Sequence, residues 1–228
     1  MDDMPKTKEE QYQVCVDAAD ERGFERFGLR SNESWHEDPK HLVFRLARYK
    51  FVAKMLSGYR HVLEVGCGDA FGSRIVQAEV GAYTGIDFDP IFIDDVKSRM
   101  VPRWAFDARV HDMLEGPVPG DFDAVFALDV LEHIEPADER LFLKNSFASL
   151  VPHGVAIIGV PSLESQVYAS TQSKLGHVNC KSAPDLKKQL QEFFHNVFIF
   201  SMNDEVVHTG YHKMAHYVFA ICADRRDA

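Results

Sequence analysis

Short apolar runs alternate with amphipathic stretches from His61 to the end of the chain. Runs typical of buried strands occupy 61–66, 82–87, 108–111, 122–129, 154–160, 196–202 and 215–223. Helical patterns lie between most of these runs, at 71–80, 90–100, 137–150 and after Pro184. Strands and helices that alternate at this spacing indicate a mostly parallel sheet with helices on both faces. The pattern therefore predicts an α/β, doubly wound fold with a seven-stranded sheet.

The residues before this region predict a different organisation. The stretch from Met1 to about Arg30 is charged and weakly patterned, which is typical of a loosely packed or partly disordered helical arm. Asp38 and Pro39 suit the N-cap and first position of a helix that ends at Gly58. We expect residues 1–57 to form an N-terminal arm and helix, and residues 58–228 to form the main domain.

Composition narrows the class of protein. The 228 residues carry a formal net charge of −10, and no apolar run approaches the roughly 18 residues of a membrane span. The N-terminus lacks a secretory pattern and the 4 cysteines form no C-x-x-C pair, so we expect a cytoplasmic protein. The acidic balance without a basic block disfavours nucleic acid and favours a small-molecule substrate.

One long stretch without periodicity, from Pro161 to Ala183, follows the fifth predicted strand. Loops longer than about 12 to 15 residues in a compact domain are usually functional or disordered. We interpret residues 161–183 as a lid over the substrate.

The segment LEVGCGDAFGS places Gly66, Gly68 and Gly72 between a buried strand and a helix. Glycine lets the chain turn sharply and approach a ligand closely, although a tight turn without a ligand has the same pattern. Asp87 ends the next strand, 21 residues after Gly66, where an acidic residue in doubly wound folds binds ribose hydroxyls. Together these features predict a nucleoside site.

Two carboxylates bear on the choice of nucleoside. Glu64 precedes the glycine-rich turn and Asp69 lies within it. Both would repel the diphosphate of a nicotinamide dinucleotide, whereas a cationic sulfonium beside them is favourable. The sequence therefore favours S-adenosylmethionine, which becomes S-adenosylhomocysteine on methyl transfer, over NAD.

From about Val62 to Val160, the chain resembles the class I S-adenosylmethionine-dependent methyltransferases. The segments E-V-G-C-G, G-I-D, V-H-D and FDAVFALDVLEHI look like successive motifs of the small-molecule branch, which includes methyltransferase type 11 and ubiquinone-biosynthesis enzymes. One departure is Ala70, where many members have a third glycine. The resemblance implies a Rossmann-like methyltransferase fold.

The resemblance also implies a set of site residues. Gly66, Cys67 and Gly68 would line the methionine part of the cofactor, and Asp87 would hold the ribose. Phe88, Asp112 and Met113 would contact the adenine, and Leu128 would lie near the methionine end. The charge of Glu64 would favour the sulfonium. Tyr49 would close over the cofactor from a capping helix, and Trp35 lies in a similar capping region. Cys67, Phe88, Met113 and Tyr49 could instead be ordinary core positions, and Asp112 could cap a turn.

Methyl transfer needs a base only if the acceptor must lose a proton. Histidine is the usual base near neutral pH. His133 follows the fourth predicted strand, His177 lies in the predicted lid, and His208 precedes His212 and His216 between the last two strands. His133, His177 and His208 are the candidate catalytic residues, and each of them could instead be a surface or core histidine.

The D-V-L-E-H segment offers a second interpretation. Asp129, Glu132 and His133 have side chains that can bind a divalent ion, and similar positions coordinate magnesium in ubiquinone-biosynthesis O-methyltransferases. The same segment occurs in members with no known metal use, so we expect no metal.

The sequence thus predicts S-adenosylmethionine-dependent methyl transfer to an oxygen or nitrogen of a small polar molecule, such as a sugar, sugar nucleotide or secondary metabolite. The alternatives are a catalytically degenerate methyltransferase fold that binds a partner and, less favoured, an NAD-dependent oxidoreductase. The sequence leaves the oligomeric state open.

Overall fold

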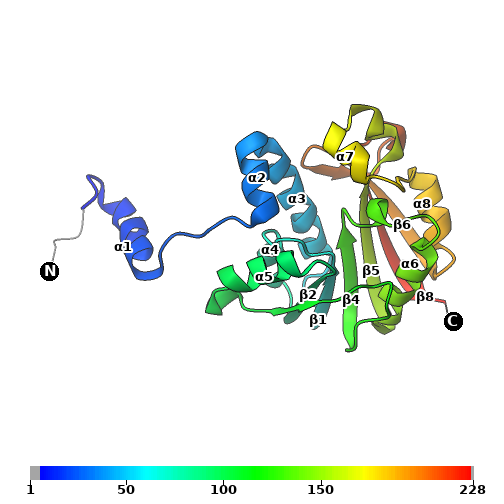
Figure 1. Ribbon diagram of the computed structural model, residues 1–228, viewed down its shortest axis with the longest axis horizontal. Coiled ribbons are helices and arrows are strands. Elements are labelled where there is room, and N and C mark those ends of the chain that lie inside the picture. The colour runs from blue at the N-terminus through cyan, green and yellow to red at the C-terminus, as the bar shows by residue number, and fades with distance from the viewer. Residues whose placement is uncertain (1–5, 227–228) are drawn as a thin grey trace.

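The computed structural model describes residues 6–226, so the ends of the two predicted regions, 1–5 and 227–228, lie outside it. Within that range the chain forms one sheet of 8 strands in the order β3-β2-β1-β4-β5-β8-β6-β7 (Figure 1). The strands are β1 (His61–Val65), β2 (Ala82–Asp87), β3 (Asp107–Val110), β4 (Phe122–Leu128), β5 (Leu150–Pro161), β6 (Phe194–Asn203), β7 (Val206–His208) and β8 (Tyr217–Arg225). The predicted α/β class is confirmed.

The sheet is parallel from β3 through β5, and β8 is inserted antiparallel between β5 and β6. The prediction of seven strands missed β7, which pairs antiparallel with the end of β6. A strand of 3 residues is too short to show a two-residue alternation, so its sequence carried no signal.

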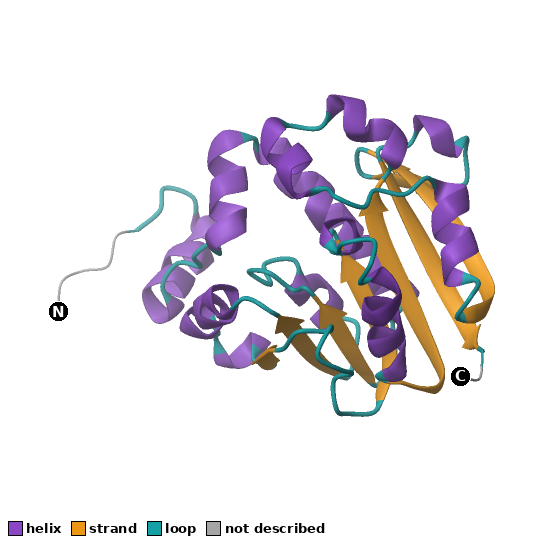
Figure 2. Ribbon diagram, turned by 45° about the vertical axis from the view of Figure 1, so that its right-hand side comes forward, coloured by secondary structure: helices purple, strands orange, loops and turns teal. Residues whose placement is uncertain are grey.

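Helices cover both faces of the sheet (Figure 2). Figure 1 shows α2, α3, α4 and α5 on one side and α6 and α8 on the other. The helices are α1 (Gln13–Arg22), α2 (Leu29–Glu37), α3 (Pro39–Met55), α4 (Ser73–Gln77), α5 (Pro90–Arg99), α6 (Glu139–Ala148), α7 (Thr171–Gly176) and α8 (Ala183–Leu190).

The core is divided by the sheet because successive side chains of a strand point to opposite faces. In β4, Phe126 and Leu128 pack with residues of α3 and α4, whereas Val125 and Ala127 pack with residues of α6 and α8. A strand that is buried on both faces reads as a continuous apolar run, which is why β4 was predicted from sequence.

The N-terminal region contains more helix than its sequence indicated. The predicted helix at Pro39 is confirmed as α3, and the Asp38 side chain accepts a hydrogen bond from Lys40 N at 3.2 Å. The preceding α2 packs on α3, while α1 stands apart from the rest of the fold (Figure 1). No residue of α1 is buried, in keeping with a loosely packed arm.

The predicted lid, residues 161–183, carries short elements of its own. A 3-10 helix (Leu163–Tyr168) and α7 follow β5, and Ser162 bridges to Lys181 at the base of the segment. Helices of one or two turns are too short to display helical periodicity. Among the described residues, no helix has both the length and the apolar character needed to cross a bilayer.

Candidate functional site

A pocket lies at the carboxyl ends of β1 and β4, under α2 and α3. Ligands of open α/β sheets bind at this edge, where the strand order reverses. The pocket is lined by Arg30, Ser31, Leu42, Arg45, Leu46, Tyr49, Gly66, Cys67, Gly68, Asp69, Phe71, Gly72, Leu128 and Asp129. It therefore brings together five of the predicted cofactor residues, namely Tyr49, Gly66, Cys67, Gly68 and Leu128.

The glycine-rich turn forms one wall of the pocket. Gly66 and Gly68 have φ angles of +72° and +53°, in the left-handed region that favours glycine. A Cβ at Gly66 would lie 2.4 Å from a methyl of Val130, whereas a Cβ at Gly68 would meet no atom within 4 Å. Gly66 thus serves close packing, and Gly68 leaves its backbone open on the pocket side.

Asp87 holds this turn in place from the adjacent strand. Its carboxylate accepts hydrogen bonds from Gly68 N at 2.8 Å and from Asp89 N at 3.0 Å. The side chain is 7% exposed and does not line the pocket itself. The acid that sequence spacing assigned to ribose therefore also couples β2 to the glycine-rich turn.

The predicted adenine residues lie outside the pocket. Phe88 is 72% exposed, as an aromatic ring available for stacking would be, and Met113 is buried in the core. Asp112 accepts a hydrogen bond from Leu114 N at 2.8 Å and so caps a turn. Their contacts with an adenine stay predictions.

Glu64 lies beneath the glycine-rich turn and does not line the pocket. Its carboxylate accepts hydrogen bonds from the hydroxyls of Tyr49 at 2.6 Å, Ser73 at 2.5 Å and Tyr83. Burial raises the pKa of Glu64 to about 7, although these three hydroxyls oppose the rise. Glu64 was expected to face a sulfonium, but in this geometry its carboxylate lies outside the pocket lining. Its hydrogen bond instead fixes the position of Tyr49.

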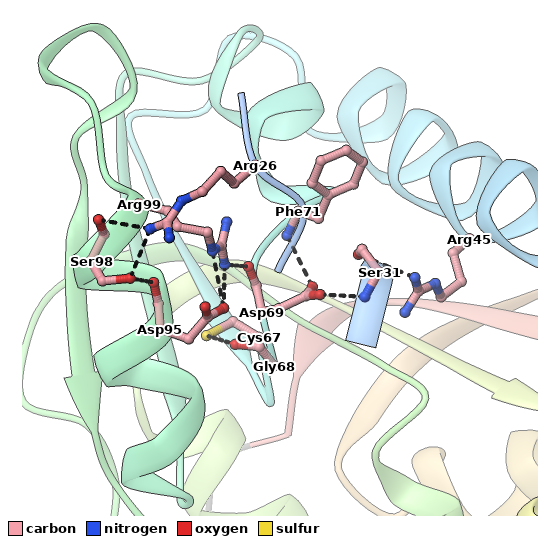
Figure 3. Close-up of polar contacts among 10 residues, drawn as sticks. All are labelled: Arg26, Ser31, Arg45, Cys67, Gly68, Asp69, Phe71, Asp95, Ser98 and Arg99. Carbon is pink, nitrogen blue, oxygen red and sulfur yellow. Dashed lines mark hydrogen bonds and ion pairs between the residues drawn. The ribbon is translucent and has the colours of Figure 1, made fainter. Parts of the chain in front are cut away.

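Asp69 does line the pocket, and its side chain binds Ser31 at the start of α2, which covers the pocket (Figure 3). Its carboxylate accepts hydrogen bonds from Ser31 N at 2.6 Å and from Phe71 N at 3.3 Å. Arg99 donates to the Asp69 backbone carbonyl at 2.7 Å, and Gly28 packs so closely that a Cβ there would lie 2.3 Å from that of Asp69.

Sequence analysis missed the cations of this wall. Arg30 and Arg45 line the pocket, and the Arg45 guanidinium donates to the Ser31 hydroxyl at 3.2 Å. The available signal was a pair of arginines, Arg45 and Arg48, within the apolar pattern of α3. Arg30 had no such signal because α2 has no regular apolar face.

Of the two predicted capping aromatics, only Tyr49 reaches the pocket. Its ring packs against Gly72, where a Cβ would lie 2.3 Å from the ring. Trp35 is 53% exposed and stacks on Phe27 at 5.7 Å between ring centroids. Trp35 therefore packs against Phe27, in the segment before α2, and does not line the pocket.

Beside the pocket, Asp129 forms a buried ion pair with Arg48. The Arg48 Nη1 lies 2.7 Å from both carboxylate oxygens, and its guanidinium lies 3.9 Å from the centre of the Tyr217 ring. Burial opposes ionisation most strongly, but the charges of Arg48, Arg30 and Arg45 and the Arg48 hydrogen bond together lower the pKa of Asp129. Asp129 has a φ of +57°, which for a non-glycine residue is a strained conformation of the kind found at functional sites.

His133 and His177 meet next to this ion pair, with 5.2 Å between ring centroids. Ligand atoms of Glu132, His133 and His177 all lie within 4.8 Å of one another. Asp129 is engaged by Arg48, so His177 replaces it in the set that the D-V-L-E-H segment suggested for a divalent ion. His208 lies at the far edge of the sheet on β7 and is bonded to Asn203 at 2.8 Å, away from the other two histidines.

Comparisons with known proteins agree with this arrangement. A family model described as "Methyltransferase domain" matches residues 62–154, from β1 into β5. A probable S-adenosylmethionine-dependent methyltransferase of Mycolicibacterium smegmatis is 31% identical over 115 residues, which are 50% of this chain and 42% of the relative. Residues 62–154 of the chain therefore form a methyltransferase domain. S-adenosylmethionine is named for the Mycolicibacterium smegmatis relative, and the solved structures that match include complexes with S-adenosylhomocysteine.

Other relatives of the methyltransferase domain extend the comparison. The mitochondrial ubiquinone biosynthesis O-methyltransferase of Schizosaccharomyces pombe is 27% identical over 45% of this chain and 38% of its own length. The chain thus spans less than half the length of both curated relatives. The N-methyltransferase NodS of Bradyrhizobium japonicum, solved with S-adenosylhomocysteine, matches with a TM-score of 0.61 over 83% of this chain and 90% of its own, at 18% identity. At that identity the likeness concerns the fold.

Proposed function

We propose that the protein transfers a methyl group from S-adenosylmethionine to an oxygen or nitrogen of a small polar molecule. The observation that carries the proposal is the pocket, which has the open backbone of the glycine-rich turn on one wall and the guanidinium groups of α2 and α3 on another. This combination suits a ligand that has a flexible polar chain and a carboxylate.

The pocket residues fit the methionine part of S-adenosylmethionine. Arg45 supplies a positive charge to a carboxylate, and Arg30 has no ion pair or side-chain hydrogen bond within residues 6–226. Asp69 and Asp129 supply negative charge, which suits an ammonium group and a sulfonium. Asp87 would hold the ribose from the neighbouring strand end, as its spacing predicts.

When bound, S-adenosylmethionine supplies a methyl group that the positively charged sulfur activates. The protein then contributes orientation, because holding a nucleophile in line at about 3 to 3.5 Å lowers the barrier to displacement. His133 and His177 are the candidate bases near the pocket. Burial, together with the neighbouring His133 ring, lowers the pKa of His177 and so favours its neutral, proton-accepting form.

We further propose that the helices before residue 58 cap the cofactor and that residues 161–183 cover the acceptor. Both segments reach the carboxyl edge of β4, where Arg48 of α3 pairs with Asp129 at 2.7 Å and Val178 N donates to the Glu132 carbonyl at 2.9 Å. An acidic surface without a basic block favours a small molecule over nucleic acid as the acceptor.

Calorimetric titration with S-adenosylhomocysteine tests cofactor binding. We expect Asp87→Ala to weaken binding at least tenfold, because the variant loses both the ribose partner and the hydrogen bond to Gly68. Asp107→Ala, which removes an exposed acid of β3, serves as the control and should bind as the wild type does. Absence of binding to the wild-type protein at high micromolar concentration would refute the proposal.

Methyl transfer itself is tested with a small-molecule extract and S-adenosylmethionine. The expected result is a metabolite that gains 14 mass units together with formation of S-adenosylhomocysteine. Cofactor binding without any such product would instead identify a partner-binding protein with a methyltransferase fold.

A further inference from the structure

Arg30 is an arginine of the pocket wall that has no partner. It lies in the first turn of α2, is exposed, and lines the pocket together with Arg45 and Asp129. Within residues 6–226 its guanidinium makes no ion pair and no hydrogen bond, although Glu33 follows one turn later on the same helix. All of its N–H donors are therefore free to bind a ligand.

The position of Arg30 does not stabilise its own helix. The first turn of a helix carries a partial positive charge, so a cation there is unfavourable. The first turn of α2 contains no acidic residue that would offset this cost. The carboxylate that does cap this turn, Asp69, binds Ser31 N at 2.6 Å and not Arg30. A role in ligand binding accounts for an unpaired arginine at this position, whereas a role in folding does not.

The pocket as a whole carries excess positive charge. The guanidinium groups of Arg30, Arg45 and Arg48 outnumber the carboxylates of Asp69 and Asp129. S-adenosylmethionine would add a further positive charge, because its ammonium and carboxylate groups cancel and its sulfonium does not. Like charges that share a pocket repel one another, so the cofactor complex favours an anionic second ligand.

The two arginines of the pocket lining lie in different surroundings. Arg45 is half-buried, and its guanidinium donates to the Ser31 hydroxyl at 3.2 Å. Arg30 is exposed and lies within electrostatic range of the predicted lid, because burial, the His133 ring and the charge of Arg30 each lower the pKa of His177. Arg45 therefore suits the cofactor carboxylate, whereas Arg30 lies between the cofactor pocket and the predicted lid.

We propose that the methyl acceptor carries an oxyanion, either a carboxylate or a phosphate group, and that Arg30 binds this group and so determines acceptor specificity. The inference rests on the proposed methyl transfer. A guanidinium group matches both oxyanions, because its planar fork donates two parallel N–H···O hydrogen bonds. The predicted lid has the same sign of charge, with Lys174 and Lys181 against Glu164.

The contact would hold the acceptor at a group other than the reacting atom. The Arg30 guanidinium keeps its charge throughout the reaction, so it exchanges no proton and forms no covalent bond. It contributes by fixing the acceptor so that the nucleophile lies in line with the methyl group. Because the contact is made before transfer as well as during it, its loss should raise KM more than it lowers kcat.

Thermal unfolding of the S-adenosylhomocysteine complex tests recognition of an oxyanion without any turnover. The probes are sodium acetate and sodium methyl phosphate, compared at equal ionic strength with sodium chloride and with sodium chloride plus acetamide. We expect an oxyanion to raise Tm above both references, and the more effective probe shows whether a carboxylate or a phosphate is bound. The increase should disappear in Arg30→Gln, which removes the charge, and should persist in part in Arg30→Lys, which keeps it.

Arg26→Gln is the matched control. Arg26 is an exposed arginine of the segment before α2, donates to the Ser98 carbonyl at 3.4 Å, and does not line the pocket. The Arg26→Gln variant should keep the Tm response and so corrects for the loss of one positive charge. Equal responses of the wild type to the oxyanions and to chloride, or an unchanged response in Arg30→Gln, would overturn the inference.

Calorimetry with S-adenosylhomocysteine tests whether Arg30 binds the cofactor carboxylate instead. Binding should weaken much less in Arg30→Gln than in Arg45→Ala. An equal loss in the two variants, with unchanged binding of 5′-methylthioadenosine, would assign Arg30 to the cofactor and overturn the inference.

The extract assay separates this inference from the proposed function. The methyl acceptor identified there by mass spectrometry should contain a carboxylate or phosphate group. With that acceptor, Arg30→Gln should raise KM at least about tenfold, the loss expected for a charged hydrogen-bonded pair, while Arg26→Gln should leave KM unchanged. An acceptor with neither group would overturn the inference and leave methyl transfer intact, whereas absence of S-adenosylhomocysteine binding to the wild type would refute the proposed function.

Discussion

The Asp69 carboxylate accepts a hydrogen bond from the backbone N–H of Ser31 at 2.6 Å, across 38 residues of sequence. Asp69 belongs to the glycine-rich turn, and Ser31 lies in the first turn of α2. The first N–H groups of a helix lack partners within the helix, and a carboxylate there is also favoured by the helix dipole. One side chain thus joins the cofactor turn to the helix that covers it.

Replacing Asp69 by alanine should loosen α2. Loss of a side chain that caps a helix costs about 1 kcal/mol, which corresponds to roughly fivefold weaker binding if α2 must be in place for the cofactor. Calorimetry with S-adenosylhomocysteine and hydrogen exchange of residues 29–37 measure the two effects. Unchanged exchange in α2 would contradict this role, and Asp107→Ala again serves as the control.

Alanine at Gly66 and at Gly68 should have different effects. An alanine at either position would be strained by roughly 1 to 2 kcal/mol, because both backbones are left-handed. Only the alanine at Gly66 would also collide with Val130. Urea unfolding should therefore show the larger loss for Gly66→Ala and partial recovery in Gly66→Ala/Val130→Ala. Gly68→Ala should mainly weaken cofactor binding, since its Cβ enters the pocket; equal stability losses for both variants would contradict the packing.

Arg45→Ala should weaken binding of S-adenosylhomocysteine at least tenfold if its guanidinium pairs with the cofactor carboxylate. The same variant should bind 5′-methylthioadenosine, which lacks the amino acid group, as the wild type does. Calorimetry with both ligands gives the comparison, and Arg109→Ala, an exposed arginine of β3, controls for loss of one positive charge. Equal losses for both ligands would place Arg45 outside the carboxylate site.

Glu64 should make stability depend on pH. Because the folded-state pKa is raised from 4.5 to about 7, the native protein holds the proton more tightly. The resulting stabilisation is fully present below about pH 4.5 and is lost as pH rises to 7; its upper limit is on the order of 3 kcal/mol. The free energy of unfolding should therefore fall less between pH 5 and 8 in Glu64→Gln than in the wild type, and parallel profiles would argue against a buried proton.

Breaking the Arg48–Asp129 pair should be costly. Arg48→Met leaves a buried carboxylate without its partner, which typically costs about 3 to 5 kcal/mol. Arg48→Met/Asp129→Asn removes both charges and should recover much of that loss in urea unfolding. A single variant as stable as the wild type would show that Asp129 reaches water or another cation.

The sequence by itself determined the sheet apart from β7, the helices from α3 to α6 and α8, and the glycine-rich turn. Local signals were sufficient there: strands such as β4 are continuous apolar runs, Asp38 and Pro39 mark the start of α3, and Gly66 and Gly68 need left-handed φ angles. The distance from Gly66 to Asp87 reflects one strand–helix–strand unit, so it was also readable along the chain.

Only the tertiary structure decided which charged side chains face the pocket. Glu64 and Asp69 lie five residues apart, yet their environments differ. Glu64 is buried beneath the glycine-rich turn, where it accepts hydrogen bonds from hydroxyl groups, whereas Asp69 binds the first turn of α2 above the pocket. Arg30 and His177 reach the site through segments without apolar periodicity, and His208 is carried to the far edge of the sheet. These outcomes depend on contacts between residues distant in sequence, and the energy of such contacts leaves no periodic pattern along the chain.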